Sequence, residues 1–254
     1  MKILAAQIVI MSAFILAWQF LVPENAVPYF SHPDAVARKL VDLLRGREIY
    51  RDIWVTFVEI ALGYLLGAVV GLSLGFILGR SAILSDILQP FIMGLYSVPK
   101  IALAPLFIVW LGLGLSSKVA VVFLSSFFLI FFNTYSGLQT INEELVRLAR
   151  IMGASWPQTV VRIILPAAAD KIFIGLKTAV PYAVIGAVIG EYIGSSEGLG
   201  YFILYASQTY DTPALFSGII ILVAIVFIAN SILSAFEGRI IRWRSSQQGQ
   251  TVQI

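Results

Sequence analysis

The sequence predicts an all-α integral membrane protein with about six transmembrane helices and both termini in the cytoplasm. Two features of the composition point to a membrane: 59% of the 254 residues are hydrophobic, and only 12% are charged. Soluble proteins carry about twice that share of charged residues. In addition, six segments are long enough, at about 20 apolar residues each, to cross the hydrocarbon core. They run over about 3–22, 54–79, 83–112, 118–139, 172–193 and 214–236.

The expected orientation follows from where the basic residues fall. Six spans place both ends of the chain on one side, and several basic groups share that side: Lys2, Arg80, those of 140–171, Arg239, Arg242 and Arg244. Lysine and arginine in short loops favour the cytoplasm, so we expect this side to be inside. The loop 23–53, placed outside, opposes this with its own basic residues, Arg38, Lys39, Arg45, Arg47 and Arg51.

Three parts are expected along the chain. Residues 1–53 form a first transmembrane helix and a periplasmic amphipathic loop, 54–244 form the membrane core, and 245–254 form a polar, disordered tail. Within the loop, 34–44 carries its apolar residues on one face of a short helix, which suits the membrane surface. His32 beside it is expected on the surface, because one imidazole cannot build a metal site alone. The lack of cysteine excludes disulfides, thiol catalysis and cysteine metal sites.

The second apolar segment carries a glycine at every fourth position: Gly63, Gly67, Gly71, Gly75 and Gly79. Residues four apart lie on one face of a helix, and small residues there let another helix approach closely in lipid. We therefore expect a helix-packing face within the subunit. A sliding surface between moving helices is the alternative.

The third apolar segment, 83–112, is interrupted by Pro90, Pro99 and Pro105. Proline lacks a backbone donor and kinks a helix, and membranes tolerate such breaks where protein or a water-filled cavity satisfies the backbone. The pattern predicts a discontinuous helix beside a transport path. A surface helix followed by a kinked span is the alternative.

Charged residues inside the apolar segments mark candidate path positions, because a charge at mid-bilayer costs about 3 kcal/mol and faces a cavity or a partner. They are Glu59, Lys100, Lys177 and Glu191. Glu59 and Lys177 lie near segment ends, where they can act as anchors. Lys100 and Glu191 are predicted to line a translocation path, together with Tyr96 and Asn133. A structural ion pair is the alternative for each of the two charges.

The segment 142–166 is too polar to cross a bilayer, and its pattern predicts two helices joined at a turn. Gly153 permits the tight turn because it lacks a Cβ. Ser155 caps the second helix and Pro157 falls in its first turn, where a missing amide costs nothing. We expect Leu165 and Pro166 to end that helix.

This segment resembles the cytoplasmic EAA loop of bacterial ABC importer permeases, the coupling helix of that family. The family's spacing is met by Ala149, Gly153, Ile163, Leu165 and Pro166. The resemblance implies an ATPase-coupling interface made by these residues with Arg147 and Ala154. Arg147 departs from the family, whose motif begins with glutamate. We therefore expect an acidic residue opposite it in the ATPase groove.

From about Arg51 to Arg244 the chain is similar to the permeases that serve sulfonate, taurine, nitrate and pyrimidine-precursor importers. The similarity rests on 99–105, 110–118, the 142–166 segment, and Glu191 with 198–201. The stretch 180–191 and Lys100 favour the branch for thiamine-precursor pyrimidines, riboflavin and related aromatic compounds.

The resemblance implies the type I importer fold in a multi-pass protein of the bacterial inner membrane. Its implied partners are a second permease copy in a homodimer, two cytoplasmic ATPases and a periplasmic binding protein, with membrane lipid around them and no nucleic acid. ATP and Mg²⁺ would be used by the ATPases, and no cofactor is expected on this chain. It has no glycine-rich loop ending in Gly-Lys-Ser or Gly-Lys-Thr, so it cannot hold the nucleotide itself. Transport would proceed by alternating access.

Two other classes compete with this interpretation. An ion-coupled secondary transporter, independent of an ATPase, would carry its own coupling carboxylate, and Glu191 is the plausible one. A membrane-embedded enzyme would need clustered catalytic groups, and serine, histidine and acidic residues form no such cluster in the sequence. Genes for an ATPase and a secreted binding protein beside this one would favour the importer.

Overall fold

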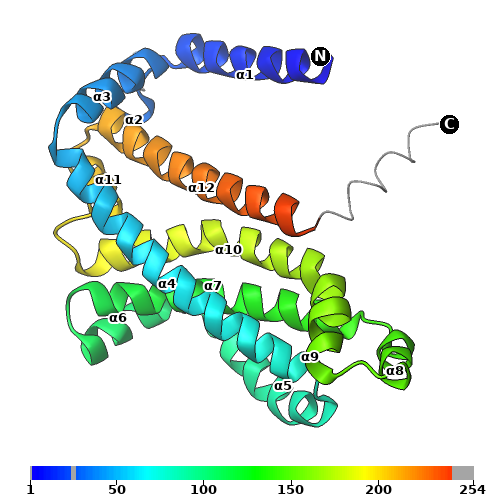
Figure 1. The fold of residues 1–254 in the computed structure, drawn as a ribbon. Helices are drawn as coiled ribbons and strands as arrows, with labels where there is room; N and C mark the ends of the chain where they lie inside the picture. Colours follow the sequence, from blue (N-terminus) through cyan, green and yellow to red (C-terminus); the bar gives the residue numbers. More distant parts are fainter. Residues whose placement is uncertain (1, 24–26, 242–254) are drawn as a thin grey trace. The chain divides into compact units, whose positions relative to one another are not determined.

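The computed structural model of the chain describes residues 2–23 and 27–241, and within them every regular element is a helix. Arg242, Arg244 and the predicted tail lie outside the described residues. The helices in Figure 1 are α1 (Lys2–Leu21), α2 (Val27–Phe30), α3 (Pro33–Arg45), α4 (Glu48–Gly79), α5 (Ala82–Ser97), α6 (Lys100–Leu111), α7 (Leu115–Gln139), α8 (Glu143–Ile151), α9 (Trp156–Thr159), the π-helix η2 (Val160–Ile164), α10 (Leu165–Gly194), α11 (Leu199–Gln208) and α12 (Thr212–Ile240).

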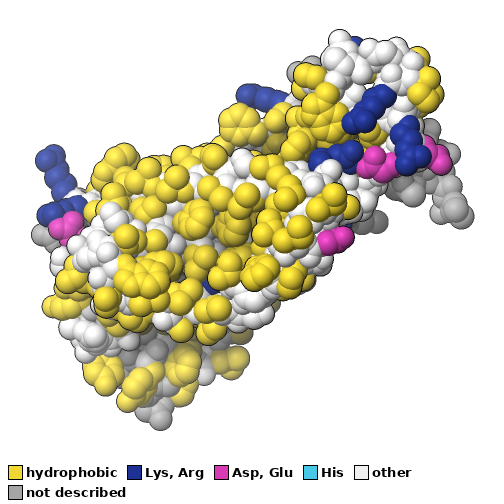
Figure 2. Space-filling view, turned by 90° about the horizontal axis from the view of Figure 1, so that it is seen from below, with side chains coloured by type: hydrophobic (Ala, Val, Ile, Leu, Met, Phe, Trp, Pro, Cys, Tyr) yellow, Lys and Arg dark blue, Asp and Glu magenta, His cyan; other side chains and the backbone are white. Residues whose placement is uncertain are grey.

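Four stretches of the described chain are long and apolar enough to cross a membrane: Ile49–Gly79, Leu115–Gln139, Trp156–Gly194 and Thr212–Ile240. A fifth is the pair α5 and α6, which meet at a bend of 90°. The expected first span corresponds to α1, whose apolar stretch, Ala5–Leu21, is shorter. Figure 2 shows a face on which hydrophobic side chains predominate, as expected of a surface that meets lipid rather than water.

The chain divides into two compact units, each described by itself. Unit 1 comprises Met1–Val58 and Glu191–Ala224, and unit 2 comprises Glu59–Gly190 and Ile225–Ile254. In unit 1, α3 is held at several points along its length. Val36 is buried, and its carbonyl accepts a hydrogen bond from the Ser217 hydroxyl. Lys39 forms an ion pair with Asp211 at 2.7 Å. The short amphipathic helix predicted at 34–44 is therefore present.

In unit 2, the glycine face of α4 packs against α7. A Cβ added to Gly63 or Gly75 would come within 3.0 Å of α7 atoms. The α7 residues opposite the five glycines also recur at every fourth position: Val122, Ser126, Ile130, Thr134 and Leu138. Backbones this close gain packing energy along the whole seam, which confirms the predicted packing face.

The order of these contacts fixes how the chain runs through unit 2. Gly63 faces Val122 and Gly79 faces Leu138, so α4 and α7 are parallel. The chain must therefore return from the end of α4 to the start of α7 through α5 and α6. Figure 1 accordingly shows α5 near the last turns of α4 and α6 near the first turns of α7. The bent pair is thus a broken span that traverses the layer, and the predicted discontinuity falls at Pro99, the N-cap of α6.

A second seam joins α7 to α10, in the antiparallel direction. Gly137 faces Lys171, whereas Gly190, late in α10, faces Lys118, early in α7. The expected helix end at Leu165 and Pro166 is wrong, because the helical path continues through them into α10. The wider turn of η2, in which Leu165 donates to the carbonyl of Val160, precedes the proline. A π-turn of this kind lets a helix admit a proline that an α-helical interior would reject.

Candidate functional site

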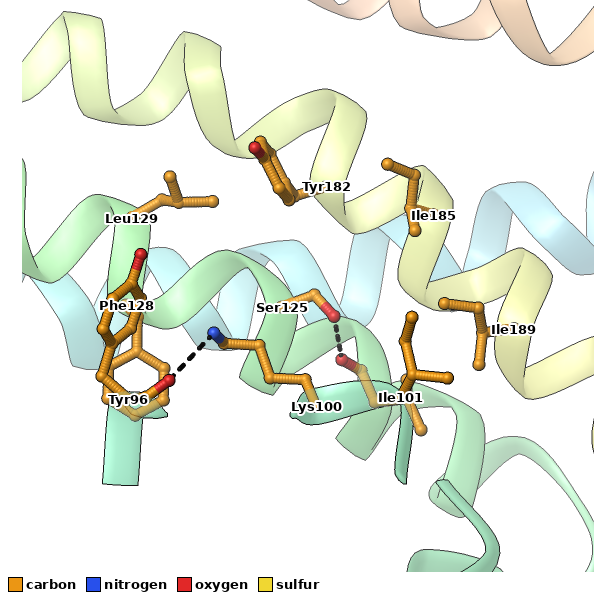
Figure 3. Close-up of a pocket in the computed structure, with 10 residues that line it drawn as sticks. Tyr96, Lys100, Ile101, Ser125, Phe128, Leu129, Tyr182, Ile185 and Ile189 are labelled. Atoms are coloured by element: carbon orange, nitrogen blue, oxygen red, sulfur yellow. Dashed lines mark hydrogen bonds between the residues drawn. The ribbon is translucent and has the colours of Figure 1, made fainter. Parts of the chain in front are cut away.

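A pocket in unit 2 brings together two of the four predicted path residues. Tyr96 comes from the end of α5, and Lys100 from the first turn of α6, on the other side of the break at Pro99. The cavity measures about 250 Å³. Its remaining lining comes from α6, α7 and α10: Ile101, Val121, Ser125, Phe128, Leu129, Tyr182, Ile185 and Ile189. Figure 3 shows these side chains around the Lys100 ammonium.

The position of the Lys100 ammonium is set by aromatic rings. It lies 4.3 Å from the ring centroid of Tyr96 and 5.3 Å from that of Phe128, and it donates to the Tyr96 carbonyl at 3.5 Å. The Tyr96 ring in turn meets Phe128 and Phe132 edge-on. Ring faces attract a cation without taking up its hydrogen-bond donors. The arrangement can therefore hold an ammonium group that still offers hydrogen bonds to a solute.

The other two predicted path residues lie elsewhere. Asn133 donates to the carbonyl of Leu129 at 2.8 Å, and its Cβ stands opposite Gly175 in the seam between α7 and α10. Glu191 belongs to unit 1, where it is fully buried. Its carboxylate accepts hydrogen bonds there from Thr56 and from the amide of Gly200.

Glu191 forms part of a cap for helix α11. The three backbone amides at the start of α11 each donate to a side-chain oxygen. The amide of Gly198 donates to Asp52 at 2.7 Å, that of Leu199 to Thr56 at 2.8 Å, and that of Gly200 to Glu191. The Thr56 hydroxyl also donates to Glu191. First-turn amides have no partner inside their own helix, so these three side chains satisfy them. The negative charges of Asp52 and Glu191 also suit the positive end of the helix.

The remaining charges in the apolar segments form pairs that were not assigned from the sequence. In unit 2, Glu59 of α4 accepts from Lys118 of α7 at 2.8 Å, and both are buried. Lys177 of α10 pairs with Glu237 of α12. These carboxylates and ammonium groups are thus engaged with one another, whereas Glu59 and Lys177 were expected to act as anchors. The available signal was that lone opposite charges in apolar spans tend to be partners.

The predicted coupling segment forms helix α8, a turn and helix α9 at one end of unit 2 (Figure 1). Gly153 has φ +86°, the left-handed conformation that glycine adopts without strain. Ser155 caps α9 in a capping box with Gln158, and proline stands in the first turn, as predicted. Arg147 is exposed, and Ala149 and Ala154 are partly exposed.

The segment is fixed to the membrane helices on its inner side. Val146 is 2% exposed and packs with Leu138 at the end of α7, Ile164 in η2 and Ala168 at the start of α10. Arg80, which follows α4, donates to Glu143 at 2.5 Å. This hydrogen bond lowers the pKa of Glu143, burial opposes the shift, and the charges of Arg80, Arg147 and Arg150 add to it.

Its outer side is apolar and basic. Large hydrophobic side chains are exposed along it: Leu145, Leu148, Ile151, Met152, Trp156 and Val161. The Arg150 guanidinium lies 5.1 Å from the centroid of the Trp156 ring. An apolar surface on a polar segment is typical of a protein contact. Of the predicted interface residues, Leu165 is exposed and Ile163 and Pro166 are half-buried, so they contribute less outer surface than α8 does.

Comparisons with known proteins agree on one family. Residues 56–242 match the family described as binding-protein-dependent transport system inner membrane component. The chain is 33% identical over 85% of its length to the putative aliphatic sulfonates transport permease protein SsuC of Bacillus subtilis, covering 79% of that protein. It is 32% identical over 91% of its length to the formylaminopyrimidine transport permease protein ThiX of Halalkalibacterium halodurans, covering 92% of it. The fold is similar to a chain of the MetNI methionine ABC transporter in an inward-facing conformation, with a TM-score of 0.67 and 20% identity, covering 76% of this chain and 96% of that one.

The family match covers most of the chain, including the broken span, both helix seams and the coupling segment. Proteins of this family are translocation subunits, so neither the ion-coupled carrier nor the membrane-embedded enzyme describes this chain. The family implies an ATPase, a binding protein and a dimeric arrangement. The chain belongs to the binding-protein-dependent transport system inner membrane components, the permease subunits through which ABC importers move solutes across the inner membrane.

Proposed function

We propose that this permease works as a homodimer with two cytoplasmic ATPases and a periplasmic binding protein, and imports a small organic solute by alternating access. The relatives carry names that include aliphatic sulfonates and formylaminopyrimidine, and both are small organic solutes. A cavity of about 250 Å³ suits a solute of that size better than a peptide. The proposed path runs past Tyr96 and Lys100 at the broken span.

The observation that carries the proposal is the construction of the coupling segment. Its outer side offers an apolar and basic surface, while Val146 and the Arg80–Glu143 pair attach it to the ends of α4, α7 and α10. A force applied to α8 therefore reaches three membrane helices through packed side chains. A segment so attached can transmit the closure of two ATPases to the permease, and interfaces of this kind switch between discrete arrangements.

The orientation rests on the basic residues of unit 2. Because α4 and α7 run in one direction and α10 runs in the other, Arg80 and the coupling segment lie at the same end of this unit. Arg147, Arg150, Arg162 and Lys171 add further positive charge at that end. Under the positive-inside rule this end faces the cytoplasm, where the ATPases are found.

The cycle follows from these placements. ATP and Mg²⁺ are held by the partner ATPases, whose closure draws the coupling segments together. The two permeases then rock from an inward-open to an outward-open arrangement, and the binding protein releases its solute into the path between them. Hydrolysis of ATP returns the pair to the inward-open arrangement.

The test replaces Gly153 by glutamate in the complex co-expressed with its ATPase and binding protein. The backbone of Gly153 is left-handed and the space around it is open, so the change strains the turn without creating a clash in the core. The matched control is Gly46→Glu, at another exposed glycine after a helix, with φ −72°. ATP-driven uptake is measured in proteoliposomes, together with ATPase association.

Gly153→Glu should abolish uptake, or the ATPase activity coupled to it, while Gly46→Glu retains both. A Gly153→Glu complex that assembles and transports like wild type would show that this segment does not transmit the motion of the ATPases.

A further inference from the structure

We propose that the Lys100 pocket selects a solute that carries a negative charge on a flat, largely apolar body. This inference rests on the proposed function, because it names the solute class for the path through the broken span. Lys100 would bind the anionic group directly, and the surrounding apolar and aromatic side chains would hold the body of the solute.

The first argument is that Lys100 differs from Lys118 and Lys177, two other lysines on the membrane helices of unit 2. Lys118 is paired with Glu59 and Lys177 with Glu237. Among the described residues, no carboxylate lies within ion-pair distance of Lys100; its neighbours are two ring faces and the Tyr96 carbonyl at 3.5 Å. A cation among apolar membrane helices is stabilised by a negatively charged partner. Here the protein supplies only the partial negative charges of two ring faces and one carbonyl.

The second argument is that the ammonium is held in place before any solute arrives. Phe128 is 2% exposed, and its ring packs against Tyr96, Phe127 and Phe132 in a fixed cluster. The rings of Tyr96 and Phe128 lie together on one side of the ammonium, as Figure 3 shows, and both contribute to its position. A charge that is already positioned binds an anion with little loss of side-chain freedom.

The third argument comes from the walls of the pocket. Ile101, Ile185 and Ile189 give it an apolar side. Three lining side chains carry a hydroxyl: Tyr96, Ser125, which already donates to the carbonyl of Val121, and Tyr182, which is half exposed. One cation, three hydroxyls, of which that of Ser125 is already engaged, and otherwise apolar or aromatic walls match a solute with a single acidic group. They do not match a sugar or another solute with many hydroxyls.

A missing carboxylate also suits transport. A built-in acidic partner would compete with an anionic solute for Lys100, whereas the ring faces bind the ammonium without occupying its donors. A transport site must bind well enough to admit the solute and weakly enough to release it. An ammonium held by aromatic faces meets both conditions.

The experiment uses the purified complex of permease and ATPase in nanodiscs, without the binding protein. Its probes are benzoate and benzamide, which share shape and differ in charge, and ligand-observed NMR gives the affinity for each. Wild type should prefer benzoate. Lys100→Met should weaken benzoate binding about tenfold to a hundredfold, because it removes a hydrogen bond to a charged group. The affinity for benzamide should stay unchanged. Lys100→Arg should keep the preference, and so should Arg45→Met, which removes an exposed positive charge on α3.

Three results would overturn the inference: wild type binds neither probe, it binds benzamide as well as benzoate, or Lys100→Met leaves the ratio of the two affinities unchanged. ATP-driven uptake of the solute delivered by the binding protein is measured with the same preparations. If uptake persists while benzoate is not preferred, solute selection at Lys100 fails and the importer function stands. If wild type shows no ATP-coupled uptake, the importer function itself fails.

Discussion

Replacing Lys118 by methionine should destabilise the permease strongly. Glu59 is 1% exposed and accepts a hydrogen bond from Lys118 at 2.8 Å, so the substitution leaves a carboxylate inside unit 2 without its counter-charge. Removing one partner of a buried ion pair costs about 3–5 kcal/mol, far above the cost at an exposed pair. Methionine has nearly the length of lysine, so little of this loss comes from a cavity.

The double substitution Glu59→Leu with Lys118→Met should recover most of that loss. It removes both charges and keeps the side-chain volumes close to those of the native pair. Such apolar replacements are neutral or stabilising in buried sites. The interaction free energy from the double-mutant cycle should then be about 3 kcal/mol or more.

The assay is reversible unfolding in mixed detergent and lipid micelles, with far-UV circular dichroism as the signal. Arg38→Met is the control, because Arg38 pairs with Asp34 at the surface and both side chains are more than half exposed. It should change the free energy of unfolding little. If Lys118→Met loses no more than this control, or if the double variant is as unstable as Lys118→Met, then the buried pair does not hold α4 to α7 as described.

Three further predictions follow from other contacts. Gly75→Ala should lower the free energy of unfolding by about 1–3 kcal/mol in the same assay, because its Cβ would press on α7. Gly94→Ala, in open space within a helix, should raise it by about 0.5–1 kcal/mol. Equal losses in the two variants would contradict the packing of α4 on α7. The hydrogen bond from Arg80 is the main reason why the pKa of Glu143 is lowered in the folded state, so the stabilisation from this pair is fully present above the unfolded pKa near 4.5 and is lost as the pH falls through the lower folded pKa. The free energy of unfolding, measured as a function of pH, should therefore fall more steeply below pH 4.5 in wild type than in Glu143→Gln. Parallel curves would show that the pair contributes nothing. Gly198→Ala should loosen α11, since φ is +106° and the new Cβ would meet the Glu191 carboxylate that caps this helix; faster amide hydrogen exchange in α11 would show it, and unchanged exchange would refute it.

The sequence alone was sufficient for the features that depend on neighbours along the chain. The glycines four apart predicted a packing face, and Pro99 lies at the predicted break. The turn at Gly153 also follows from local chemistry, because a glycine in the left-handed conformation after a helix depends only on the residues next to it in the sequence.

Features that depend on distant neighbours could not be predicted. Nothing in the glycine pattern says that α7 is the partner, or that it runs parallel to α4. Glu59 and Lys118 are 59 residues apart, and only the fold shows that they meet. Pro166 was mistaken for a helix end because a π-turn that accommodates proline leaves no clear mark in the sequence. The charge of Lys100 led to the prediction that it lines the path, but the sequence could not show that the ring of Phe128, on another helix, lies next to its ammonium.

The parallel seam between α4 and α7 also has a consequence for biogenesis. Lys118 leaves the ribosome 59 residues after Glu59. At about 5–20 residues per second, Glu59 has been synthesised for roughly 3–12 s before its counter-charge exists. During this interval the glycine face of α4 has no helix to receive it, and a carboxylate there would weaken insertion into lipid. We expect nascent α4 to be retained at the translocon until α7 emerges. The two helices would then enter the bilayer together as one unit.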